Sequence, residues 1–123
     1  MSKVLIDACG WAAIIEGGFN VDLAMADVVG TFEPVLLNRV LDELEMIQEK
    51  TTSPLLLDFL KSRSELIVGP EEASHPDDQL VIIASRENWP VLTVDRRLKQ
   101  RLVEMNCSYI EVMSGQNLRL VSL

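Results

Sequence analysis

Residues 3–18 read KVLIDACGWAAIIEGG, an apolar run that ends in an acid and is followed at once by a segment of helical composition. Residues 3–7 are typical of a short buried strand, because branched apolar side chains favour strands. The pair Gly17 and Gly18 marks the end of the following helix, since glycine adopts the backbone conformation found there. The stretch therefore predicts a strand followed directly by a helix.

The same alternation repeats along the rest of the chain. Short apolar runs predict further strands at 34–37, 65–68, 90–94 and 108–112, and residues 118–123 fit either a last edge strand or a tail. Composition and periodicity predict helices at 20–32, 39–50, 54–63, 76–88 and 96–105. Apolar strands separated by helices are typical of a parallel sheet covered on both faces. We therefore expect an α/β fold, a three-layer α-β-α sandwich with a central, mainly parallel sheet.

Polar residues mark several of the helix starts. Asn38 is a good N-cap for the helix that follows it, and Ser53 with Pro54 resembles a cap followed by the first helical residue. Ser74 with Asp77 resembles a capping box at the next helix.

Length, composition and charge limit the classes of protein to consider. The 123 residues suffice for one compact domain, 1–123, and not for two. No apolar stretch approaches the roughly 20 residues of a membrane span, and the start is unlike a signal peptide, so we expect a cytoplasmic protein without a membrane partner. Two cysteines, Cys9 and Cys107, make neither a disulfide framework nor a zinc site. The formal charge of −8 by itself argues against a nucleic-acid partner, because phosphate binding normally needs basic residues. Two interpretations of the charge remain: an acidic surface without a specific role, or acids gathered around a divalent cation.

Several acids are predicted to meet at one edge of the sheet. Asp7 ends the first strand and Asp95 ends the fourth; Asp77 and Asp78 open the helix after the third, and Glu43 lies about a turn into the helix after the second. The carboxyl ends of parallel strands form the working edge of such a sheet. Each acid also has a local interpretation, as a helix cap, a first-turn residue or a solvated side chain. Their shared location favours a Mg²⁺ or Mn²⁺ site, because carboxylates this close repel one another unless a cation neutralises them. Such a site can activate water for phosphodiester hydrolysis.

Four segments carry a resemblance to a known family: VLIDACGWAAI (4–14), VLLNRVLDELEMI (35–47), PDDQLVIIA (76–84) and WPVLTVDRRLKQRL (89–102). In order and spacing they resemble PIN-domain nucleases, most of all the small archaeal Fcf1-related members, over nearly the whole chain. The resemblance implies a divalent-metal-dependent endoribonuclease with Mg²⁺ or Mn²⁺ as cofactor and RNA as substrate. It also implies four catalytic and metal-binding acids, which are Asp7, Glu43, Asp78 and Asp95. Asp77 then becomes an accessory acid that supports the ligands.

Other positions match or depart from the family pattern. Thr93 stands where the family often has a small hydroxyl residue beside the fourth acid, so it is expected to support the ligands. Ala8, Cys9 and Val94 replace polar residues that are frequent in the family, which weakens the expectation of activity. Four basic residues follow the fourth acid, either as a phosphate-contacting rim or as ordinary solvated charges: Arg96, Arg97, Lys99 and Arg101.

Three functions stay open at this level. A PIN-type ribonuclease would act in RNA processing, together with a processing partner. Alternatively, it would be the toxin of a toxin–antitoxin pair, with an antitoxin as its partner. By analogy with the family, a homodimer is expected. A catalytically degenerate PIN fold would bind RNA or protein without cutting. A receiver-type switch domain would need a pair of acids early in the chain, which this chain lacks.

Overall fold

The structure is a computed structural model that describes residues 2–114 and 116–122. Helices and strands alternate along the chain, in the order β1 (Ser2–Ile6), α1 (Ala8–Glu16), α2 (Val21–Val29), β2 (Phe32–Leu37), α3 (Asn38–Lys50), α4 (Leu57–Arg63), β3 (Glu65–Ile67), α5 (Pro76–Glu87), β4 (Val91–Leu92), α6 (Arg96–Glu104), β5 (Tyr109–Met113) and β6 (Asn117–Val121). None of the helices in these ranges is long and apolar enough to cross a membrane.

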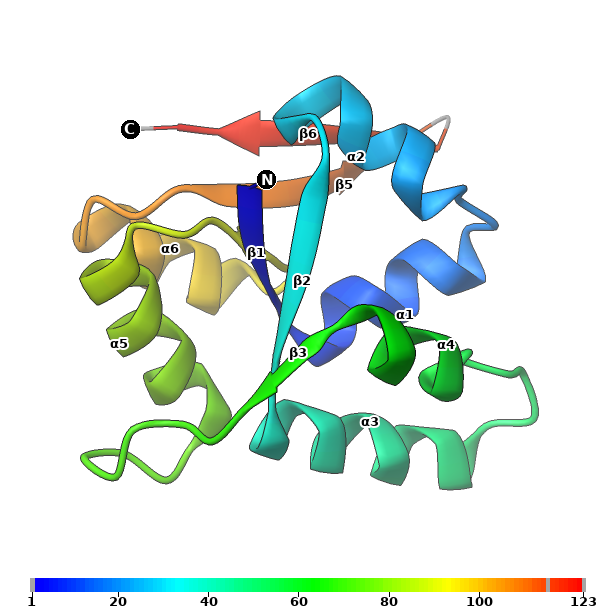
Figure 1. The fold of residues 1–123 in the computed structure, drawn as a ribbon, viewed down its shortest axis with the longest axis horizontal. Coiled ribbons are helices and arrows are strands. Elements are labelled where there is room, and N and C mark those ends of the chain that lie inside the picture. The colour runs from blue at the N-terminus through cyan, green and yellow to red at the C-terminus, as the bar shows by residue number, and fades with distance from the viewer. Residues whose placement is uncertain (1, 115, 123) are drawn as a thin grey trace.

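The strands form one sheet in the order β3-β2-β1-β4-β5-β6. Strands β1 to β5 are parallel, and β6 returns antiparallel to β5 as an edge strand, which decides the open question about the C-terminal residues. Starting from β1, the chain adds β2 and then β3 on one side of this strand. After α5 it returns to β1 and adds β4, β5 and β6 on the other side. Right-handed crossovers therefore place α1 to α4 on one side of the sheet and α5 and α6 on the other (Figure 1). The predicted three-layer sandwich with a mainly parallel sheet is confirmed.

The central strands explain where the core lies. Val4, Leu5 and Ile6 of β1 are fully or almost fully buried, so helices cover both faces of this strand. Helix α1 packs Trp11 and Ile14 into the same core. The indole nitrogen of Trp11 donates to the backbone carbonyl of Leu55 at 2.8 Å, which ties α1 to the loop before α4.

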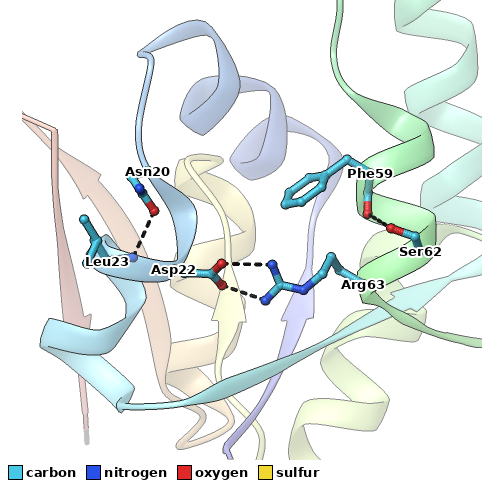
Figure 2. A network of polar contacts seen from close by, with 6 residues as sticks. All are labelled: Asn20, Asp22, Leu23, Phe59, Ser62 and Arg63. Atoms are coloured by element: carbon cyan, nitrogen blue, oxygen red, sulfur yellow. Dashed lines mark hydrogen bonds and ion pairs between the residues drawn. The ribbon is translucent and has the colours of Figure 1, made fainter.

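A polar contact on the surface joins α2 to α4. Two guanidinium nitrogens of Arg63 donate to both carboxylate oxygens of Asp22, at 2.6 and 2.9 Å (Figure 2). The guanidinium also lies over the ring of Phe59, which stacks on Trp11 with 6.3 Å between ring centroids. Because exposed ion pairs add at most about 1 kcal/mol, the contact orients the two helices while the core supplies most of the stability.

Two predicted helix starts are wrong. Asn38 is the first residue of α3 and not its cap, because its side-chain oxygen accepts a hydrogen bond from the Gly69 backbone of the neighbouring strand end, at 3.4 Å. Helix α4 begins at Leu57, after Leu56 in a left-handed conformation, and not at Pro54. Instead, the side chain of Gln48 on α3 holds the loop that precedes α4.

The predicted capping box at α5 is also wrong. His75 is the N-cap of α5, and its Nδ1 accepts a hydrogen bond from the backbone N–H of Asp77 at 3.1 Å. The imidazole therefore does what the sequence reasoning assigned to Ser74. The two first-turn acids, Asp77 and Asp78, lie where they were predicted.

Candidate functional site

The candidate site lies where the direction of the sheet order reverses. Strand β1 has β2 on one side and β4 on the other, and the crossovers from these strands leave on opposite faces of the sheet. In open α/β sheets this arrangement leaves a crevice outside the carboxyl ends of the two central strands. Asp7 directly follows β1, and Thr93 and Asp95 follow β4. The backbone of Asp7 donates to the carbonyl of Leu92 at 3.0 Å, so the two strand ends are in direct contact.

Gly10 allows this close approach. A side-chain carbon at Gly10 would lie 2.6 Å from the carbonyl oxygen of Leu92, which is closer than such atoms can pack. Only glycine therefore lets the first turn of α1 rest on the end of β4, and this turn carries Asp7.

Asp7 is a buried carboxylate with specific partners. Its Oδ1 caps α1 by accepting from the backbone N–H of Ala8 at 2.9 Å. Its Oδ2 accepts from the hydroxyl of Thr93 at 2.7 Å and from the thiol of Cys9 at 2.9 Å. The side chain is almost excluded from solvent, with 4% of the residue exposed. A carboxylate at this depth is tolerated because hydrogen bonds replace its hydration.

Cys9 is a donor to this acid, which sequence reasoning missed. Burial and, after it, the Asp7 carboxylate raise the pKa of the Cys9 thiol to about 11. The sulfur therefore keeps its proton at neutral pH and can donate to Asp7. Cys9 therefore supplies a hydrogen-bond donor at a position where the sequence-based expectation was the loss of a polar group.

Thr93 connects Asp7 to Asp95. Its hydroxyl donates to Asp7 and accepts from the backbone N–H of Asp95 at 3.1 Å. Asp95 caps α6, as predicted, with Oδ1 accepting from Arg97 and Leu98 at 2.8 and 3.1 Å. The two acids that follow β1 and β4 are thus held by one buried hydroxyl.

Glu43 and Asp77 lie within electrostatic reach of Asp7. Burial raises the pKa of Asp77, and the Asp7 and Asp95 carboxylates raise it further, while His75 and Arg101 lower it. Burial likewise raises the pKa of Glu43, followed by the effect of Asp7 and Asp77. The Asp7 carboxylate therefore acts on both Glu43 and Asp77, although burial is the larger cause of each pKa shift.

Asp78 has a different partner. Its Oδ1 accepts from the guanidinium of Arg101 at 2.7 Å, and about half of each side chain is exposed. The structure therefore groups Asp77 with Asp7, Glu43 and Asp95, and pairs Asp78 across the α5–α6 contact. Sequence reasoning gave the ligand position to Asp78 and the accessory position to Asp77.

A pocket of ≈ 390 Å³ brings acidic and basic side chains together, and it is lined by His75, Asp77, Asp78, Asp95, Arg97 and Arg101. Two of the four predicted phosphate-contacting residues thus face the acids. Lys99 instead lies 3.6 Å from Glu111 and over the ring of Tyr109, and Arg96 is exposed. Sequence reasoning missed His75 as a lining residue; its place directly before the two acids was the available signal.

The carboxylates near the strand ends have the ligand chemistry that a hard divalent cation prefers. Within residues 2–114 and 116–122, no three acidic, histidine or cysteine side chains stand close enough together to hold one metal ion as they are placed. Mg²⁺ keeps several of its waters and needs only one or two direct carboxylates. Burial and, after it, the Asp7 carboxylate raise the pKa values of Glu43 and Asp77, and a bound cation would offset this repulsion between carboxylates.

Comparisons with known proteins identify the fold. No known protein-family profile matches the sequence, and no curated protein matches it. Among solved structures, the chain is similar to the "Structure of the PIN domain endonuclease Utp24", with a TM-score of 0.80, 18% sequence identity, and coverage of 98% of this chain and 92% of that chain. The fold is PIN-like. At this identity the likeness concerns the fold alone.

Proposed function

We propose that the protein is a divalent-metal-dependent ribonuclease of the PIN type that hydrolyses RNA phosphodiesters at the acidic edge of its sheet. The proposal rests on one observation above all. Asp7 and Asp95 follow β1 and β4, where a site is expected in this kind of sheet, and Glu43 and Asp77 are near enough for the Asp7 carboxylate to raise their pKa values. The description of Utp24 as an endonuclease agrees with this function.

The four gathered acids would hold Mg²⁺ or Mn²⁺, which when bound supplies a Lewis acid and an activated water. Thr93 keeps the carboxylate of Asp7 and the backbone of Asp95 in fixed positions through its two hydrogen bonds. The sequence resemblance favours Asp78 as the third ligand. The ion pair of Asp78 with Arg101 and the place of Asp77 beside Asp7 favour Asp77, and we propose Asp77.

Arg97 and Arg101 would bind the phosphates of the RNA. Both line the pocket that also contains Asp77 and Asp95, so a phosphate bound there would lie beside positive charge. Arg101 would have to exchange its ion pair with Asp78 for the phosphate, whereas Arg96 is exposed and Lys99 lies beside Glu111.

A degenerate PIN fold that binds RNA or protein without cutting is the second candidate. The bonds that Asp7 already makes to Ala8, Cys9 and Thr93 favour it, because they occupy part of the capacity of both carboxylate oxygens. This candidate predicts binding of RNA that does not depend on a metal ion.

The test is cleavage of single-stranded RNA with Mn²⁺ or Mg²⁺ by the wild type and by Asp7→Asn, Asp77→Asn and Asp78→Asn. Asp58→Asn, at a fully exposed carboxylate on α4, is the matched control. Cleavage that is lost in Asp7→Asn and kept in Asp58→Asn supports the ribonuclease. Wild-type protein that cuts no more than Asp7→Asn would contradict it, and RNA binding alone would then favour the degenerate module. Loss of cleavage in Asp78→Asn with cleavage kept in Asp77→Asn would return the ligand role to Asp78.

A further inference from the structure

His75 lies in the wall of the acidic pocket, which has a volume of ≈ 390 Å³ and also contains Asp77, Asp95 and Arg97. It is the last residue before α5, it is exposed, and it is the only histidine of the chain. Burial and the neighbouring carboxylates raise the pKa values of Glu43 and Asp77, and His75 acts on both in the opposite sense. The imidazole therefore lies near both of these acids.

The hydrogen bond at Nδ1 of this ring decides which nitrogen carries the proton. Nδ1 accepts from the backbone N–H of Asp77 at 3.1 Å, which makes His75 the N-cap of α5. A ring nitrogen that accepts a hydrogen bond has no proton, so in the neutral imidazole the proton is on Nε2. Within residues 2–114 and 116–122, this is the only hydrogen bond of the side chain. The ring is thus held at Nδ1 and has a donor to offer at Nε2.

The surroundings of this donor attract an anion. Helices α5 and α6 both begin at the pocket, with His75 and Asp95 as their N-caps, and a helix N-terminus carries a partial positive charge. Arg97 lies in the same wall, and no ion pair of its guanidinium is found in the part of the chain that the structure describes. The carboxylates of Asp77 and Asp95 act against an anion, so a phosphate bound here requires donors, and Arg97 and His75 supply them.

We propose that His75 binds a phosphate of the RNA substrate, with its Nε2–H donating to a non-bridging phosphate oxygen beside the guanidinium of Arg97. A phosphate oxygen is a charged acceptor, and hydrogen bonds to charged acceptors are stronger than those between neutral groups. Because the ring is already held at Nδ1, little side-chain freedom is lost when the phosphate binds. This phosphate contact deepens the proposed function and rests on it in one respect, which is that RNA occupies the pocket.

Two substitutions separate the donor of His75 from its function as a helix cap. Asparagine is among the best N-cap residues, so His75→Asn keeps an acceptor for the Asp77 N–H, but its short side chain places no donor where Nε2 lies. The longer amide of glutamine reaches the place of Nε2 with an N–H group, and glutamine is not among the preferred caps, so His75→Gln keeps the donor and loses the cap. Ser74→Ala, at the exposed residue directly before, is the control.

The experiment measures binding of a short single-stranded oligouridine RNA by fluorescence anisotropy in a metal-free buffer, together with the melting temperature of each variant. His75→Asn should bind about tenfold more weakly than the wild type at an unchanged melting temperature, because one hydrogen bond to a charged acceptor is lost. His75→Gln should bind within about threefold of the wild type although its melting temperature falls by roughly 5 °C. Ser74→Ala should change neither quantity. In ¹⁵N NMR spectra of the single imidazole, the RNA should shift the Nε2 signal and leave that of Nδ1 nearly unchanged.

A residue that serves only as a helix cap gives the reverse order. His75→Gln would then lose both stability and RNA binding while His75→Asn lost neither, and this result would overturn the phosphate contact. An Nε2 signal that saturating RNA leaves unmoved would overturn it as well. Neither metal nor cleavage enters these measurements, so the two proposals can fail separately. A protein that binds RNA through Nε2 but cuts none refutes the ribonuclease alone, and one that cuts RNA while His75→Asn binds it like the wild type refutes the phosphate contact alone.

Discussion

Thr93→Val would remove the hydroxyl that joins the two ends of the candidate site while nearly preserving the shape of the side chain. Thr93 is fully buried and Asp7 almost so, which means that water cannot take the place of the lost group. Two hydrogen bonds disappear together: the one donated to the Asp7 carboxylate at 2.7 Å and the one accepted from the Asp95 backbone at 3.1 Å.

The size of the effect follows from these two bonds. A hydrogen bond to a charged acceptor contributes about 1.5–3 kcal/mol, and a bond between neutral groups about 0.5–1.5 kcal/mol. We therefore expect Thr93→Val to lower the free energy of unfolding by about 2–4 kcal/mol at neutral pH. For a domain of this size the melting temperature should fall by roughly 10 °C.

Urea unfolding followed by circular dichroism measures this change directly, with Thr52→Val as the control because Thr52 is exposed in a loop. The control should stay within about 0.5 kcal/mol of the wild type. A double-mutant cycle with Asp7→Asn should then give a coupling energy of at least about 0.5 kcal/mol, as expected for residues in contact. Thr93→Val that unfolds together with the wild type, or a cycle without coupling, would refute the role assigned to this hydroxyl.

Three further outcomes are expected. The folded protein holds the pKa of Glu43 above its ordinary value, so ionised Glu43 lowers the stability of the folded protein at neutral pH, and this cost disappears as the pH falls below about 4. In thermal melts, Glu43→Gln should therefore be more stable than the wild type at pH 7 and equally stable near pH 3. The opposite order of stability would contradict the burial of this acid. Gly69→Ala should lower stability by about 1–3 kcal/mol because its new carbon meets Gln79, and Gln79→Ala should restore part of the loss in the double variant. Cys9 should react with iodoacetamide more slowly than free cysteine at pH 8, since its pKa is raised to about 11, and Asp7→Asn should speed the reaction.

The sequence was sufficient for the fold because the central strands contain continuous apolar runs, such as residues 4–6 of β1 and 34–37 of β2. The apolar run of residues 4–6 indicates a strand that is covered on both faces. Because strands alternate with helices along the chain, only a few sheet topologies are then possible. The helix starts were less predictable. Asn38 has the chemistry of a cap, but its side chain is used by the end of a neighbouring strand, and that contact exists only after the sheet has formed.

The sequence predicted that acids follow the strands at this edge of the sheet, but it did not predict how their side chains are arranged. Sequence order places acids after successive strands, but the choice between Asp77 and Asp78 depends on the rotation of α5, which is apolar on nearly all sides and so gives no clear direction. The burial of Gln79 was equally hidden, because a glutamine in the first turns of a helix is usually a surface residue. This burial depends on the approach of Gly69 from another element.

The stacking of Trp11 on Phe59 makes the fluorescence of Trp11 a natural probe of the packing around it. Trp11 is fully buried, one turn beyond Asp7, and its indole is bonded to the loop before α4, so its fluorescence should report whether α1 and α4 are packed together. The other tryptophan, Trp89, is only partly buried, lies near Lys3 and follows α5 in the chain. Replacing Trp89 with phenylalanine would leave a single-tryptophan protein in which the opening of one layer of the sandwich can be followed without any attached dye.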